Sequence, residues 1–245
     1  TGLIWRLDLD GARQLKQIDT GHITHCNNDH GISPDGTTLV ISDSPARGTA
    51  CIYTLPITGG TPKQVTPLDP SYFHGWSPNG ARLTYTARRE GVFHICTCRV
   101  DGSDEVILTQ GHTPRNGHRD GPDYTPDGQW IWFNSDHHAK EESATPDLWR
   151  MRVDGSDLQR MTNDDRVNWF PHPSPDGVHV LYLAYPSHVQ GHPRGEDVEL
   201  RVMPASGGAP RTVAAFHGGQ GSINVPNWHP DGTRFAYMRY SRQTA

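Results

Sequence analysis

The tetrapeptide Ser33-Pro34-Asp35-Gly36 decides the fold of this chain of 245 residues, because close copies of it return along the whole length. The copies begin at Ser33, Ser77, Thr125, Ser174 and His229, so successive copies start 44, 48, 49 and 55 residues apart. Each copy is followed by a short run of strand-forming residues, such as Thr38–Ser42 after the first. A period of about 40–50 residues built from short strands is typical of the blades of a β-propeller.

A second repeated signal lies between these copies and consists of two strand-like runs joined by Asp-Gly or Gly-Gly. Such a turn between alternating runs predicts a β-hairpin. The turns fall at residues 10–11, 59–60, 101–102, 154–155 and 207–208. A unit therefore contains strand a, the tetrapeptide turn, strand b, a loop, strand c, the Asp-Gly or Gly-Gly turn, and strand d.

The order of the half-units predicts how the ring closes. The chain starts with a c–d hairpin near residues 3–18 and ends with an a–b hairpin near residues 224–240. Pairing these two hairpins would complete a blade and remove two open sheet edges. We therefore predict an all-β, single-domain propeller over residues 1–245 with five four-stranded blades, at about 21–66, 67–110, 111–163, 164–215, and 216–245 together with 1–20.

Composition restricts the partners of the protein. The net charge of −5 and the pI near 6.3 give no reason to expect nucleic acid, which favours a basic surface. No apolar run approaches the roughly 20 residues of a membrane span, and no signal peptide is recognisable. Cys26, Cys51, Cys96 and Cys98 form no Cys-x-x-Cys pair and are predicted to be free thiols. We expect a monomer.

The histidines are distributed unevenly over the predicted topology, in which the d–a and b–c loops share one face. Two of these loops, Ser135–Asp147 and Tyr185–Glu199, are long insertions of the kind that usually belongs to a binding face. Twelve of the fifteen histidines fall in loops of this face: His22, His25, His30, His74, His112, His118, His137, His138, His172, His188, His192 and His217.

The candidate binding site is the mouth of the central channel, where the residues just before each tetrapeptide enter strand a. Polar and aromatic side chains from separate blades would converge there on a rigid scaffold. The predicted ligand-binding residues are Asn28, Asp29, His30, Tyr72, His74, Asp120, Asp123, Trp169, His172, Asn224 and Asn227.

Three interpretations of this cluster remain open. Carboxylates, amides and aromatic faces suit a carbohydrate or a peptide. Imidazole and carboxylate also suit a divalent metal (Ca, Mn or Zn), held by His30, His74, His172 and Asp29, with Asp120 or Asp123 as further candidates. The third interpretation is a mouth plugged by polar side chains that bind nothing.

An aromatic residue precedes the tetrapeptide at Trp76, Tyr124 and Trp228, and Ile-Tyr or Leu-Trp follows several of the loops. In this pattern nearly the whole chain resembles the TolB-like β-propeller family. The resemblance implies a binding or scaffold module of the periplasm or cell envelope, with a protein or carbohydrate ligand. Family members commonly have six blades, so the alternative to a five-bladed ring is that a blade upstream of Thr1 is missing.

A more distant resemblance, to the oligogalacturonate lyase propellers, implies metal and histidine at the same mouth. It makes a metal-assisted polysaccharide lyase or glycosidase the alternative function, and whether the protein is an enzyme stays open. A lyase would need a base and an arginine for the acid group (Arg115, Arg119 or Arg194). A glycosidase would need two carboxylates. The catalytic candidates are His30, His74, His172, Asp120 and Asp123, with Asp29 as a further carboxylate.

Overall fold

The computed structural model describes residues 2–9, 13–111, 118–136 and 145–242. Within the repeated tetrapeptide, local hydrogen bonds make the turn. The Ser33 hydroxyl and the Thr37 amide both donate to Asp35 Oδ1, at 2.5 and 3.0 Å, and the Thr38 amide donates to Ser33 Oγ at 2.9 Å. Gly36 completes the turn with a φ of 73°, where a side chain would be strained. The tetrapeptide is therefore a self-contained turn between strands a and b.

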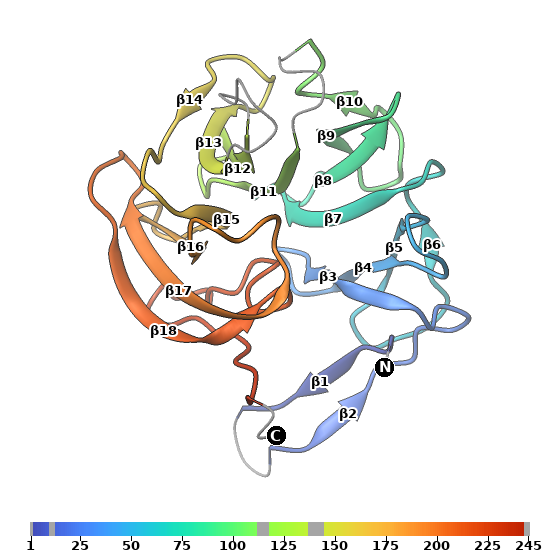
Figure 1. Cartoon of the computed structure of the whole chain (residues 1–245). Helices are drawn as coiled ribbons and strands as arrows, with labels where there is room; N and C mark the ends of the chain where they lie inside the picture. Colours follow the sequence, from blue (N-terminus) through green and yellow to red (C-terminus); the bar gives the residue numbers. More distant parts are fainter. Residues whose placement is uncertain (1, 10–12, 112–117, 137–144, 243–245) are drawn as a thin grey trace.

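The strands of the described residues form four antiparallel four-stranded sheets and one two-stranded sheet, arranged around a centre (Figure 1). This confirms the all-β propeller. The first two four-stranded sheets are β3 (Cys26–Ile32), β4 (Thr38–Asp43), β5 (Cys51–Pro56) and β6 (Lys63–Gln64), then β7 (Ser71–Trp76), β8 (Arg82–Arg89), β9 (Val92–Arg99) and β10 (Val106–Ile107). The next two are β11 (Arg119–Tyr124), β12 (Trp130–Ser135), β13 (Asp147–Arg152) and β14 (Gln159–Arg160), then β15 (Val167–Pro173), β16 (His179–Tyr185), β17 (Arg194–Pro204) and β18 (Arg211–Gly219). The two-stranded sheet pairs β1 (Trp5–Leu7) with β2 (Leu15–Gln17).

The innermost strands β3, β7, β11 and β15 each carry a break in pairing register (Figure 1). The break leaves Asn27–Asp29, His74, Gly121–Pro122 and Phe170–Pro171 outside the regular ladder. Bulges of this kind re-aim side chains and are common next to functional sites. They place polar and aromatic groups toward the centre of the ring.

Two of these bulges fit together closely. Gly121 has a φ of 61°, and a Cβ there would come within 2.9 Å of Phe170 Cδ1 and of Asn134 Oδ1. Phe170 itself has a φ of 55°, in the left-handed region, and its amide donates to Asn134 Oδ1 at 3.1 Å. Asn134 in one blade thus fixes the bulge of the next blade.

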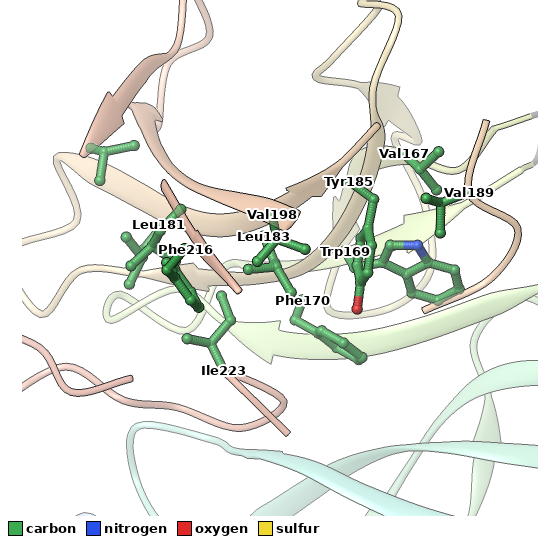
Figure 2. Packing of buried hydrophobic residues seen from close by; sticks show 12 residues of the cluster. Val167, Trp169, Phe170, Leu181, Leu183, Tyr185, Val189, Val198, Phe216 and Ile223 are labelled. Carbon is green, nitrogen blue, oxygen red and sulfur yellow. The ribbon is translucent and has the colours of Figure 1, made fainter. Parts of the chain in front are cut away.

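Apolar side chains from both faces of the blades form the core. The largest hydrophobic cluster packs Trp169, Leu183, Tyr185 and Val198 of the β15–β18 sheet together, all buried (Figure 2). Trp228 and Phe235, from the C-terminal a–b segment, pack against the same cluster. The C-terminal segment is therefore held by the last complete blade.

The fifth predicted unit is not one sheet. Within the described parts of the chain, β1 and β2 pair only with each other, and the C-terminal a–b segment has a single bridge, between Trp228 and Phe235. The amides of Met238 and Tyr240 donate instead to the carbonyls of Ser222 and His217. No ladder between the described residues joins this C-terminal segment to the N-terminal hairpin, so four of the five predicted units are complete blades.

Two smaller expectations concern cysteines and membrane spans. All four cysteines are free, and burial raises the pKa of the Cys96 thiol to about 12, as expected for an inert core thiol. Among the residues with described structure, none belongs to a helix long and apolar enough to span a membrane.

Candidate functional site

A cavity of about 280 Å³ lies where the inner strands of the four complete blades meet. Its walls come from the bulges of β3, β7 and β15, from β8, β9 and β11, and from the loops after β16 and β18. The lining residues are Asn27, Asn28, Asp29, Tyr72, His74, Thr86, Phe93, His118, Asp120, Phe170, His192, Gln220 and Asn224.

Asp120 is the hub of this cavity. Its Oδ1 accepts hydrogen bonds from Thr86 Oγ1 at 2.8 Å, from the Gly121 amide at 2.8 Å and from His74 Nε2 at 3.0 Å. Its Oδ2 faces the Nε2 atoms of His118 and His192, each at 3.5 Å. Burial would raise the pKa of Asp120, but hydrogen bonds from His118 and His74 outweigh it and hold the pKa well below the usual value. Asp120 is therefore ionised.

His74, the bulge residue of β7, bridges two acceptors. Its Nδ1 lies 3.0 Å from the Asn224 carbonyl and its Nε2 lies 3.0 Å from Asp120 Oδ1, so both nitrogens must carry hydrogen. Burial lowers the pKa of His74, but the hydrogen bond and charge of Asp120 and the charge of Asp29 raise it overall. His74 is thus an imidazolium paired with Asp120.

Asp29, in the bulge of β3, is a buried carboxyl whose pKa is higher than that of an ordinary aspartate. Burial is the main reason that its pKa is raised to about 6, and the negative charge of Asp120 adds to the effect. The charge of His74 and hydrogen bonds from Asn27 and Asn224 oppose it. The cavity therefore contains one carboxylate that stays ionised and one carboxyl that changes state near pH 6.

Replacing Asp29 by Asn is expected to remove a pH-dependent loss of stability. The pKa of Asp29 is about 6 in the folded state and 3.8 as its ordinary value, so between these pH values the folded state binds more protons than the unfolded state. The stability of the wild type therefore falls as the pH rises from about 4 to above 6. The free energy of unfolding of the wild type relative to Asp29→Asn should fall by about 2–3 kcal/mol between pH 4 and pH 7. Urea unfolding of both proteins at several pH values measures this. If the difference in free energy of unfolding between the two proteins does not change with pH, Asp29 has its ordinary pKa in the folded state.

His118, Asp120 and His192 form a histidine–carboxylate cluster that could hold a metal ion, with one ligand atom from each residue and all three atoms within 4.8 Å of one another. The metal set expected from the sequence is not brought together. His74 and Asp29 line the cavity, whereas His30 is exposed and His172 is held elsewhere.

His172 and Asp123 make a second buried pair beside the cavity. His172 Nδ1 lies 3.1 Å from Asp123 Oδ2, and its Nε2 lies 2.6 Å from the Ile223 carbonyl. Burial raises the pKa of Asp123, against the opposing hydrogen bond and charge of His172. The pair connects β11, β15 and the segment that follows β18. Its role in the fold is therefore structural.

The remaining predicted residues have varied positions. Asn28, Tyr72 and Asn224 line the cavity. Trp169 is buried behind it, with its ring 4.4 Å from that of His192, and Asn227 donates to the Ala236 carbonyl. Arg194 lies over the Tyr240 ring and Arg119 is buried. Arg115, His112, His137 and His138 fall outside the described residues.

Sequence reasoning did not single out His118, His192 or Gln220 as site residues. His118 had a usable signal, because it stands two residues before Asp120 at the entry to strand a, and alternate residues of an extended segment share a face. His192 lies in the long insertion after β16, which the sequence identified as a loop without showing which of its residues returns to the centre. For Gln220 there was no signal.

A larger surface groove of about 1060 Å³ runs along β17, β18 and the C-terminal segment. Four of its charged groups pair with each other. Arg166 contacts Glu199 at 2.8 Å, and Arg242 contacts Asp197 at 2.7 Å. The smaller central cavity, whose polar groups face an open space, is the better candidate site.

No family model matches the chain. The uncharacterized protein Atu1656 of Agrobacterium fabrum is 48% identical over 239 residues, covering 98% of this chain and 78% of that protein. A solved structure from Agrobacterium tumefaciens that carries TolB in its name is 47% identical, with a TM-score of 0.91, over 98% of this chain and 84% of its own.

Two more distant structures share the fold. TolB from Acinetobacter baumannii is 18% identical with a TM-score of 0.69, over 94% of this chain and 52% of its own. A chain of the nidogen–laminin complex is 14% identical with a TM-score of 0.64, over 87% of this chain and 75% of its own.

Proposed function

The chain belongs to the TolB-like β-propeller family, and from that premise we propose that it is a binding module that holds a neutral carbohydrate ligand in the central cavity. The fold supports a binding or scaffold role in general. The observation that carries the finer proposal is the convergence of Asp29, His74 and Asp120 from three separate blades on one cavity.

The chemistry of the cavity suits hydroxyl groups. Asp29, Asp120 and Asn224 offer acceptors, His74 is a cation that offsets Asp120, and Tyr72 and Phe170 offer ring faces. A volume of about 280 Å³ is slightly below the usual 300–1,000 Å³ of sites for drug-sized molecules. We infer that the cavity takes one sugar ring at a time, as a free saccharide or as the end of a chain.

The cellular placement is part of the same proposal. The likeness to TolB proteins supports a periplasmic or cell-envelope location, where carbohydrate polymers and other envelope proteins would be available as ligands or partners. A protein partner that enters the cavity with a polar side chain is the competing form of the binding role.

The proposal is tested by calorimetric titration with neutral hexoses, N-acetylhexosamines and their disaccharides in buffer containing EDTA. We expect one site, and replacement of Tyr72 by Ala should weaken binding about 5-fold, because a ring face worth about 1 kcal/mol is lost. Tyr237→Ala is the matched control, since Tyr237 is an exposed tyrosine outside the cavity. Failure of all these saccharides to bind, or equal binding by both variants, would contradict a carbohydrate site.

A second candidate, a carbohydrate-active enzyme, is favoured by one observation. Asp29 and Asp120 share a cavity, and their environments push their pKa values apart, which is the usual pattern of a general acid paired with an ionised carboxylate. A metal-assisted reaction would also need an ion at the His118–Asp120–His192 cluster. Assay of polysaccharides for new reducing ends or unsaturated products separates the two functions, because a binding module releases neither.

A further inference from the structure

Three potential ligand atoms face one another at the edge of the cavity. Asp120 Oδ2 lies 3.5 Å from His118 Nε2 and 3.5 Å from His192 Nε2. All three atoms lie within 4.8 Å of one another. Four tetrahedral ligands bound at about 2.0–2.1 Å stand about 3.4 Å apart, so the two distances from Asp120 Oδ2 to the histidine nitrogens are close to those around a zinc ion.

The hydrogen bonding of His192 involves its Nδ1 and leaves its Nε2 directed at the cluster. His192 Nδ1 is in hydrogen-bond contact with Gln220 Oε1, which can only accept, so Nδ1 carries the hydrogen. The other ring nitrogen, Nε2, faces Asp120 Oδ2 at 3.5 Å. A cation bound between His192 Nε2 and Asp120 Oδ2 would be coordinated by both atoms.

The surroundings orient the same atoms. Asp120 Oδ1 is held by Thr86, Gly121 and His74, which leaves Oδ2 for an ion. The His192 ring is packed against Trp169, at 4.4 Å between centroids, and against Phe170, at 5.3 Å. Outer hydrogen bonds that fix ligand tautomer and direction, backed by an apolar wall, are typical of metal sites.

We propose that His118 Nε2, Asp120 Oδ2 and His192 Nε2 bind a divalent transition metal ion, with zinc as the best match, and leave a coordination position open to the cavity. Two imidazoles and one carboxylate suit zinc and its neighbours, whereas calcium and magnesium prefer oxygen ligands. This goes beyond the proposed function, because the ion is held with no organic ligand present.

The test is a calorimetric titration of Zn²⁺ into EDTA-stripped, dialysed protein without saccharide. We expect one site per chain. His192→Ala should weaken it by about 100-fold or more, and Gln220→Ala, which removes the outer hydrogen bond, by about 10–100-fold. His217→Ala is the matched control: His217 contacts Asp197 at 3.4 Å but is no part of the cluster, so zinc binding should be unchanged. Ca²⁺ and Mg²⁺ should give no comparable site.

A spectroscopic readout separates loss of the site from loss of the fold. Co²⁺ in place of Zn²⁺ should give visible absorption bands in the wild type that disappear in His192→Ala, while the circular dichroism of the two proteins stays the same. Absence of saturable zinc binding, or equal binding by the wild type and His192→Ala, would overturn the proposal. Because saccharide binding is measured in EDTA and zinc binding without saccharide, each of the two binding results can fail without the other.

Discussion

Replacement of Asp120 by Ala is expected to destabilise the protein by about 3–5 kcal/mol, because it leaves buried partners without an acceptor. The His74 imidazolium, 2% exposed, would keep only the Asn224 carbonyl, and Thr86 and the Gly121 amide would lose their hydrogen bonds. Urea unfolding at pH 7, followed by circular dichroism, measures the change.

The control for Asp120 is Asp101→Ala, at an exposed turn where the aspartate caps Ser103. This substitution should cost about 1 kcal/mol or less. Asp120→Asn retains an acceptor for Thr86 and should be less damaging than Asp120→Ala. A loss of under about 1 kcal/mol for Asp120→Ala would mean that the polar hub does not hold the inner strands together.

Replacement of Phe170 by Ala is expected to cost about 3–5 kcal/mol, the usual range for a buried phenylalanine. Phe170 is fully buried in the main core cluster (Figure 2), stacks on His74 at 6.1 Å and lines the cavity. Thermal and urea unfolding measure the loss of stability. Ligand titration under native conditions should also show weaker binding, because one wall of the cavity is removed.

Phe235→Ala is the matched control for Phe170. Phe235 is only partly buried and makes one edge contact with Trp228, at 5.2 Å, and another ring contact with Tyr237, at 6.4 Å. Its removal should cost about 1 kcal/mol. Equal losses for the two variants would show that the centre of the ring is no more tightly packed than its C-terminal margin.

The propeller could be predicted from the sequence because its turns are made locally. Asp35 and its equivalents bond to backbone within a few residues, so the signal does not depend on distant parts of the chain. The closing of the ring depends on distant backbone hydrogen bonds. The amides of Met238 and Tyr240 could have bonded to either neighbour, and only the structure shows that they bond beside β18.

The candidate site could be predicted in part. Asp29, His74 and Asp120 were identified because the entry to strand a leads to the channel. The register breaks decide which of the remaining side chains reach the cavity. The break in β15 turns Phe170 toward the cavity and leaves His172 on Asp123, and no local pattern in the sequence marks it. The position of His192 depends on the path of the long loop between β16 and β17.

A crystal structure with the saccharide that binds best in solution would decide where the protein holds its ligand. We expect the sugar ring in the central cavity, within hydrogen-bond distance of Asp29 or Asp120 and against the ring of Tyr72. A sugar found in the groove near Arg166 and Asp197, or elsewhere on the surface with the cavity empty, would contradict the assignment of the site.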